Sequence, residues 1–291
     1  PHAMQDIYTF VGCEGEMVPH DATRVVVDVS CEVVGEDTFW SHKKITILEL
    51  LPTLHTIKKG GFYGCESLQT IVPQHKNEPL FLKKMGVRAF CGCQSLTSIP
   101  YFPILETIGP LAFCNCYSLT SIPYFPMLET IGPRAFWGCE SLTEVTLGPS
   151  IISAARECFD KCNSLIKLHC TYRTNVILPW AVTHVIIDPD TTLIHTSAFA
   201  GCDCLYGIVL IPAVTKLGPS CFWGCEKLPA NFMVSTTVKE VGIGAFARCE
   251  IDHANMPPHA MQDIYTFAGG EGEMAPPDAA RAVVDVSLDL V

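Results

Sequence analysis

Residues 89–99 read AFCGCQSLTSI, and the pattern returns at 112–122 as AFCNCYSLTSI and at 135–145 as AFWGCESLTEV. In each copy a small residue and a Phe are followed by Cys, Leu and an aliphatic residue at intervals of three. Such self-similarity at one period is typical of repeat proteins, in which every copy forms one structural turn. This stretch therefore decides the fold class, and the rest of the chain can be aligned to it.

The anchor Phe of the pattern occurs nine times at steps of 23 or 24 residues, except for the longer steps from Phe62 to Phe90 and from Phe159 to Phe199. One turn cannot bury its own apolar side chains, but stacked turns bury them against their counterparts above and below. The third position after the anchor holds Cys in eight copies and His42 in the first. The cysteines that we expect to form a buried core ladder are Cys65, Cys93, Cys116, Cys139, Cys162, Cys202, Cys225 and Cys249.

Two local structures are expected in every turn. The L-x-x-I/V-x-L segment, clearest at 142–147, predicts a short strand, and strands of successive turns would pair in parallel at about 4.8 Å. The A-F-x-x-C segment predicts a short helix or a tight turn. The fold class is therefore an α/β repeat, a solenoid of short parallel strands with short helices or turns.

The frame Φ-G-x-x-A-F-x-x-C-x-x-L-x-x-I resembles the BspA-like leucine-rich repeats, a subclass whose short units suit the spacing of the anchors. The resemblance covers roughly residues 30–250, although the sixth copy has Ala154 and Ala155 in place of the aliphatic residue and Gly. It implies a leucine-rich-repeat solenoid. Because members of the family are interaction and surface-adhesion proteins, it also implies a binding role.

Residues 1–30 recur at 258–287 with 24 of 30 positions identical. The block predicts a β-hairpin, with strands at 7–10 and 16–18, that would cap the open first turn of the solenoid. Its last part, 19–28, has a counterpart at 179–188 inside the long step from Phe159 to Phe199, which we interpret as an internal restart. We therefore expect a cap and first strand at 1–30, the solenoid at 31–256, and a truncated duplicate cap at 257–291.

Composition argues against several other functions. The formal charge of −11 is unsuited to a nucleic-acid partner, and no apolar run is long enough for a membrane span. Cysteines at zinc-site spacing, a phosphate-binding loop and a paired nucleophile and base are missing from the sequence. The glycines of 242–247 imitate a dinucleotide motif, but they belong to the repeat frame. We therefore expect no cofactor, no metal and no catalysis.

The sixteen cysteines leave alternatives open. Neighbouring turns are close enough for disulfides, but side chains in register point the same way, which favours buried reduced thiols over disulfides or a redox role. Cys91 and Cys114 are expected to be the most accessible pair. Free thiols and the absence of an N-x-S/T site favour a cytoplasmic location, with the cell surface as the alternative.

The surface is the remaining candidate for function. Side chains between the core positions of each strand would recur about every 4.8 Å on the concave face and form a rigid platform for a protein ligand. We predict a non-catalytic protein-binding scaffold, with an adhesion element built of tandem arrays as the alternative. For the two phenylalanines of this set, packing between turns is the competing interpretation. The residues predicted for the binding face are Ser98, Ser121, Glu144, Lys167, Phe102 and Phe125.

Overall fold

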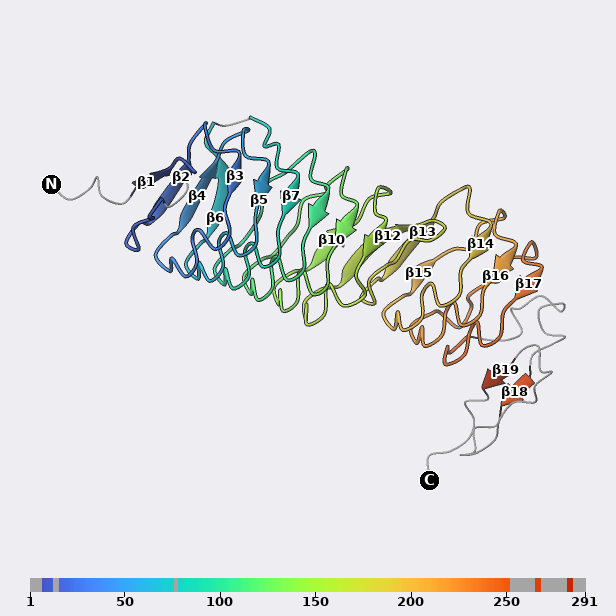
Figure 1. Cartoon of the computed structure of the whole chain (residues 1–291). Helices are drawn as coiled ribbons and strands as arrows, with labels where there is room; N and C mark the ends of the chain where they lie inside the picture. The colour runs from blue at the N-terminus through green and yellow to red at the C-terminus, as the bar shows by residue number, and fades with distance from the viewer. Residues whose placement is uncertain (1–6, 13–15, 76–77, 252–264, 268–281, 285–291) are drawn as a thin grey trace, which may run out of the picture. The chain divides into compact units, whose positions relative to one another are not determined.

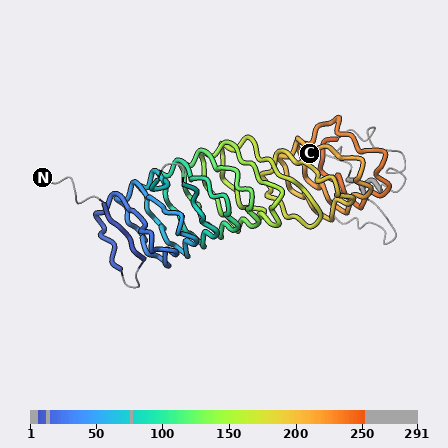
Figure 2. Tube along the Cα trace, turned by 90° about the horizontal axis from the view of Figure 1, so that it is seen from above, coloured from blue at the N-terminus to red at the C-terminus, as the bar shows by residue number. Residues whose placement is uncertain are grey.

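The computed structural model describes residues 7–12, 16–75, 78–251, 265–267 and 282–284. Two compact units divide the chain, Pro1–Leu168 and His169–Val291. Within each unit the backbone winds in successive turns that lie side by side (Figure 1, Figure 2). Every strand pairing recorded for the two units is parallel, as the repeat pattern predicts.

The first unit contains two rows of parallel strands. One row aligns as β1-β2-β4-β6, in which β1 and β2 precede the first anchor and β4 and β6 each follow an anchor. In the later turns the corresponding positions form bridges from Ser98 to Ser121 and from Ser121 to Glu144. Strands before the anchors align as β3-β5-β7-β8-β9-β11. The bounds are β1 Ile7–Phe10, β2 Arg24–Val27, β3 Val33–Val34, β4 Ile47–Leu50, β5 Thr56–Ile57, β6 Thr70–Pro73, β7 Lys84–Met85, β8 Thr107–Ile108, β9 Thr130–Ile131, β10 Glu144–Thr146 and β11 Ser153–Ala154.

The second unit repeats this arrangement. Its first row pairs β12 with β13 and β13 with β15, and its second row runs β14-β16-β17. A separate pair, β18 and β19, lies within the duplicated block. The bounds are β12 Lys167–Tyr172, β13 His184–Ile187, β14 Leu193–Ile194, β15 Gly207–Ile208, β16 Lys216–Leu217, β17 Glu240–Val241, β18 Tyr265–Phe267 and β19 Ala282–Val284.

The core consists of side chains that return at every third position of a turn. In one turn these are Phe90, Cys93, Leu96, Ile99, Phe102, Leu105 and Ile108, all of which are buried. The anchor rings stack face to face, with centroids 5.3 Å apart for Phe90 and Phe113 and an interplanar angle of 6°. Each turn therefore buries its apolar side chains against its neighbours rather than against itself, as expected for a solenoid.

The expected short helices are not formed, since the described residues contain strands and turns only. The reason is a pair of left-handed backbone positions that flank the anchors, except Phe159, where only Lys161 is left-handed. In the third turn these are Arg88 (φ 57°) and Gly92 (φ 77°), and a right-handed helix cannot continue through them. The backbone instead bonds to the next turn, where Phe90 N–H donates to the Ala112 carbonyl (2.7 Å) and Gly92 N–H to the Cys114 carbonyl (2.8 Å).

The glycine that precedes many anchors is required by the close approach of turns. A Cβ on Gly109 would lie 2.7 Å from the carbonyl carbon of Gly86 in the preceding turn. At Gly132 the corresponding distance, to the Pro110 nitrogen, is 2.5 Å. Both distances are shorter than real Cβ atoms tolerate. The Gly of the Φ-G pair is therefore needed because no side chain fits between the two turns at this position.

The predicted hairpin cap is wrong. β1 pairs in parallel with β2, with Ile7 opposite Arg24 and Phe10 opposite Val27, so it is the first rung of the solenoid. Residues 16–18 form no strand. Instead the Glu16 carboxylate accepts hydrogen bonds from the Tyr8 hydroxyl (2.6 Å) and the Gly12 N–H (2.8 Å), which holds this segment against the end of β1. Turn-forming residues between two apolar runs suggested a hairpin, but the first run, β1, pairs with β2 of the next turn instead.

Residues 179–188 fold as residues 19–28 do. Asp28 N–H donates to the Phe10 carbonyl (2.8 Å) and Asp188 N–H donates to the Tyr172 carbonyl (2.9 Å). In each case an aromatic ring also packs against the next anchor. The ring centroids of Phe10 and Phe39 are 5.0 Å apart, and those of Tyr172 and Phe199 are 4.9 Å apart. In the duplicated block, β18 pairs with β19 in the same register as β1 with β2. The rest of the predicted duplicate cap lies outside the described residues.

Candidate functional site

The polar row predicted for the binding face, Ser98, Ser121, Glu144 and Lys167, lies in the first unit. We call the solvent-facing side of the strands and bridges that carry it the outer strand face. Ser98, Ser121 and Glu144 lie opposite one another on adjacent turns, and all three are exposed. Lys167 is also exposed, and its N–H bonds to the Thr143 carbonyl one turn earlier (3.3 Å). These four side chains are thus presented at one position of successive turns.

Hydroxyl groups beside this row bond to the backbone of the preceding turn. The Thr97 hydroxyl donates to the Gln69 carbonyl (3.2 Å), and the Thr120 hydroxyl donates to the Thr97 carbonyl (3.1 Å). Because the bonds run from turn to turn, they hold neighbouring rungs in register. The polar row therefore stands on a rigid support, which reduces the entropy lost when a partner binds.

The two phenylalanines predicted for this face are not on it. Phe102 is 1% and Phe125 3% exposed, and their rings stack with centroids 6.1 Å apart in the core. The preceding residues, Tyr101 and Tyr124, are 52% and 45% exposed and supply the aromatic surface instead. The missed signal is the three-residue core spacing, because Phe102 lies midway between the buried Ile99 and Leu105.

The corresponding face of the second unit is apolar. Ile186 and Val209, on and directly after the paired strands β13 and β15, are 66% and 76% exposed, and Tyr206 is 44% exposed. Together they line a shallow hollow with Ile187 and Ile211. We call Ile186, Tyr206 and Val209 the apolar patch. Large apolar side chains on ordered strands are typical of a protein-binding surface.

Stacked imidazoles border the apolar patch. The rings of His169 and His184 lie 4.4 Å apart at an interplanar angle of 22°, and the Tyr206 ring meets His184 edge-on at 4.6 Å. His184 covers the backbone of Gly207, where a Cβ would collide with the imidazole. The two imidazoles thus extend the apolar patch from Tyr206 across β13 and onto β12.

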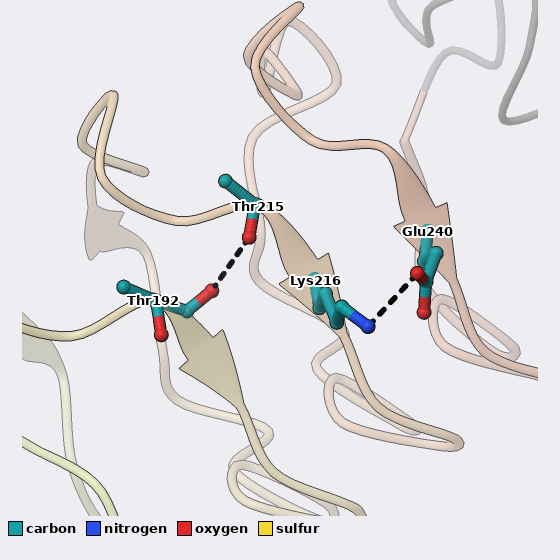
Figure 3. Close-up of polar contacts among 4 residues, drawn as sticks. All are labelled: Thr192, Thr215, Lys216 and Glu240. Atoms are coloured by element: carbon teal, nitrogen blue, oxygen red, sulfur yellow. Dashed lines mark hydrogen bonds and ion pairs between the residues drawn. The ribbon is translucent and has the colours of Figure 1, made fainter.

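The other sheet of the second unit is polar and its charges are compensated. Lys216 Nζ and the Glu240 carboxylate lie 2.9 Å apart on β16 and β17, and the Thr215 hydroxyl donates to the Thr192 carbonyl at 3.4 Å (Figure 3). Both charged side chains are more than half exposed, so the pair contributes little to stability. Substitutions on this polar sheet can therefore serve as a control for substitutions in the apolar patch.

The cysteine ladder is internal. Seven of the eight ladder thiols donate to the carbonyl of the preceding anchor, as in Cys116 to Phe90 and Cys139 to Phe113 (both 3.2 Å). The exception is Cys202, which donates to the Pro179 carbonyl (3.8 Å). His42 replaces Cys in the first turn, and its Nε2 lies 3.1 Å from the Val18 carbonyl. Burial raises the pKa of the Cys65 thiol to about 12, so the thiol is neutral at physiological pH. The fifteen cysteines in the described part of the chain form no disulfide.

The accessible thiol differs from the expected pair. Cys91 and Cys114 are only 8% and 7% exposed, whereas Cys204 is half-buried. In the described residues, no three His, Cys, Asp or Glu side chains are placed to hold a metal ion. Within that part of the chain, none of the thiols therefore belongs to a recognisable metal centre.

The repeat units of the sequence match the BspA type leucine-rich repeat region, in six copies over residues 32–166 and 180–268. The chain belongs to this family. Between the two matched ranges the match leaves out residues 167–179 of the BspA-type chain. No curated protein matches the sequence.

Several solved structures are similar to this BspA-type chain. A leucine-rich repeat protein of T. pallidum, TpLRR, is 22% identical over 77% of this chain and 82% of its own, with a TM-score of 0.41. A leucine-rich cell surface protein of Faecalibacterium prausnitzii is 19% identical over 79% and 80%, with a TM-score of 0.39. The pneumococcal vaccine antigen PcpA is 18% identical over 84% and 67%, with a TM-score of 0.47.

No helix in the described ranges is long and apolar enough to cross a membrane. Two surfaces thus remain as candidates, the polar row with Tyr101 and Tyr124 in the first unit and the apolar patch in the second.

Proposed function

We propose that the chain is a non-catalytic scaffold that binds a protein ligand through its outer strand face. The observation that carries the proposal is the exposure of Ile186 (66%) and Val209 (76%) beside Tyr206 on paired parallel strands. Burying such side chains on association would contribute roughly 25 cal/mol per Å² of apolar surface removed from water. A tyrosine such as Tyr206 at the centre of a contact is also typical of binding hot spots.

The polar row extends the proposal to the first unit. Ser98 and Ser121 supply hydroxyl groups, and Glu144 and Lys167 supply opposite charges at the same position of successive turns. Exposed charges of this kind mainly select the partner and raise the association rate. In this proposal the apolar patch provides affinity and the polar row provides specificity.

The test is a crosslinking pull-down with the full chain, followed by binding of the purified partner to three variants. Ile186→Asp combined with Val209→Asp should weaken binding by at least tenfold, because a carboxylate would have to be desolvated in the contact. Glu144→Lys with Lys167→Glu should weaken it less and change its salt dependence. Lys216→Glu with Glu240→Lys, on the polar sheet, is the matched control. Equal binding by the apolar-patch variant and the control would contradict the proposal.

A second candidate is an adhesion element in which several arrays act together. It is favoured by the starter segment, which occurs at 19–28, 179–188 and 276–285. Beads carrying the chain at increasing density would then bind cells with a steep dependence on density, because avidity grows with the number of simultaneous contacts. A linear dependence that one soluble ligand abolishes would favour the scaffold instead.

A further inference from the structure

Two tryptophans occupy the same position of the repeat frame in different units. Trp40 directly follows the anchor Phe39, and Trp223 directly follows the anchor Phe222. Although the positions match, Trp40 is 54% exposed and Trp223 is 39% exposed. The two indoles also meet different side chains from the next turn.

Trp223 is covered by an arginine. The guanidinium carbon of Arg248 lies 4.9 Å from the centroid of the Trp223 ring. This arginine is the second residue after the next anchor, where its backbone is left-handed (φ 60°). The arrangement is a cation–π contact, in which the negative face of the indole attracts the positive charge. The chain itself therefore shows that an indole at this position accepts a guanidinium group.

The first unit has the same backbone arrangement without the arginine. The corresponding position holds Gly64, whose backbone is also left-handed (φ 70°). Ser41 N–H donates to the Tyr63 carbonyl of the next turn (2.7 Å). In the second unit, Gly224 N–H donates to the Ala247 carbonyl (2.9 Å) in the same way. Because glycine has no side chain, no cation from this position reaches the indole in the first unit.

A second ring and a carboxylate surround Trp40. The Tyr63 ring meets the Trp40 ring edge-on, with centroids 5.6 Å apart and an interplanar angle of 80°, and we call these two residues the aromatic corner. Trp40 N–H donates to the Asp37 carbonyl (3.0 Å), and the Asp37 carboxylate lies against the backbone of Gly60. Tyr63 N–H donates in turn to the Gly60 carbonyl (2.9 Å). The carboxylate therefore belongs to the same two tight turns as the rings.

The charges near the aromatic corner favour a positive group from outside the chain. In the part of the chain that the structure describes, no Lys or Arg lies over the Trp40 ring. Lys43 is paired with Glu66 at 2.8 Å. Lys59 is exposed and has Glu36 at the same position of the preceding turn. The formal charge of −11 for the whole chain likewise suits a basic partner.

We propose that the aromatic corner binds an arginine side chain of the protein ligand. The contact repeats the one that Arg248 makes within the chain. The inference rests on the proposed protein-binding function but uses a different surface, the tight turns at the anchors. Arginine fits better than lysine, because its planar guanidinium group stacks on aromatic faces and is more weakly hydrated. The Asp37 carboxylate on the same turns adds electrostatic attraction.

The first test is fluorine NMR of the full chain, labelled with fluorotryptophan and titrated with a capped tripeptide of glycine, arginine and glycine. The same tripeptide with citrulline, a neutral analogue of arginine, is the control, and each resonance is assigned by replacing one tryptophan with phenylalanine. We expect the Trp40 resonance to shift saturably with the arginine peptide, with half-saturation at about 1–100 mM because one exposed cation–π contact is weak. The Trp223 resonance, whose ring Arg248 covers, should stay in place. A Trp40 resonance that is unmoved, or that moves as far with citrulline as with arginine, would overturn the proposal.

Substitutions of Gly64 test the geometry of the aromatic corner. Gly64→Arg supplies the arginine that the second unit has at this position, so it should occupy the corner and reduce the Trp40 shift by about threefold or more. Gly64→Ala, on the same left-handed backbone but without a charge, is the matched control and should keep the shift. Equal Trp40 shifts in the two variants would contradict the proposal.

Binding of the protein ligand provides the second test. With the purified partner, Trp40→Ala should weaken binding by about threefold or more, whereas Trp223→Ala, whose indole is already covered by Arg248, should have little effect. Ile186→Asp combined with Val209→Asp should leave the peptide-induced shift of Trp40 unchanged, so a failure of the apolar patch and a failure of the aromatic corner are seen separately. Equal partner binding by Trp40→Ala and Trp223→Ala would refute the role of the aromatic corner.

Discussion

The thiol of Cys116 donates a 3.2 Å hydrogen bond to the backbone carbonyl of Phe90, one turn earlier in the solenoid. That carbonyl also accepts the N–H of Cys93 within its own turn (3.2 Å). The same thiol bond recurs from Cys65, Cys93, Cys139, Cys162, Cys225 and Cys249. Cysteine at this position therefore acts both as a small apolar side chain and as a donor that connects consecutive turns.

Removal of one ladder thiol should measurably destabilise the chain. Cys116→Ala loses the bond to the Phe90 carbonyl and leaves a small void, so we expect the free energy of unfolding to fall by about 1–2 kcal/mol. Urea denaturation measures this. Cys204→Ala, at a half-buried position outside the ladder, should change it by less than about 0.5 kcal/mol. Equal losses of stability in the two variants would contradict a stabilising role specific to the ladder thiols.

The ladder also predicts a loss of stability in alkali. Burial raises the pKa of Cys65 from 9.0 to about 12, so in the folded chain the thiol remains protonated while in the unfolded chain it ionises. Its contribution is therefore complete below pH 9 and is lost as pH rises from 9 towards 12. The stability difference between wild type and Cys65→Ala, measured by denaturation at several pH values, should be constant from pH 6 to 8 and shrink above pH 9. A constant difference up to pH 11 would contradict this.

The repeat glycine can be tested against a glycine without a close backbone neighbour. Gly109→Ala places a Cβ 2.7 Å from the backbone of Gly86 and should destabilise the chain by about 1–3 kcal/mol. Gly35→Ala, at the same position of the first turn, meets only the Thr38 hydroxyl at 3.0 Å and should cost less. Thermal denaturation of the two variants provides the comparison, and a larger loss for Gly35→Ala would show that spacing between turns is not the cause.

Adjacent aromatic residues should behave oppositely. Phe125→Ala removes a buried ring that stacks on Phe102, so a loss of about 3–5 kcal/mol is expected. Tyr124→Ala, at a half-exposed ring, should cost less than about 1 kcal/mol but reduce binding of a partner that uses the outer strand face. Chemical denaturation together with partner affinity separates the two roles. If Tyr124→Ala proves as destabilising as Phe125→Ala, the ring belongs to the core.

Much of the fold could be predicted from sequence because the core repeats. Phe90, Cys93 and Leu96 return in the next turn as Phe113, Cys116 and Leu119, and that regular spacing requires stacked turns with parallel strands. The buried ladder and the repeated starter segment are visible for the same reason, since they occupy fixed positions in the frame. Of the two alternatives for the A-F-x-x-C segment, the tight turn is observed and the short helix was wrong, because local patterns do not report backbone handedness. The hairpin was wrong because they also do not report the strand with which a segment pairs.

Sequence alone determined which side chains recur and therefore which ones stack, because the period is a covalent property of the chain. Tertiary structure decided which side of each turn faces solvent. It placed Phe102 inside and Tyr101 outside, because the core takes every third residue. It also brought Ile186 and Val209 onto one exposed surface. These relationships join residues of different turns, whose distance depends on how closely the backbone can approach.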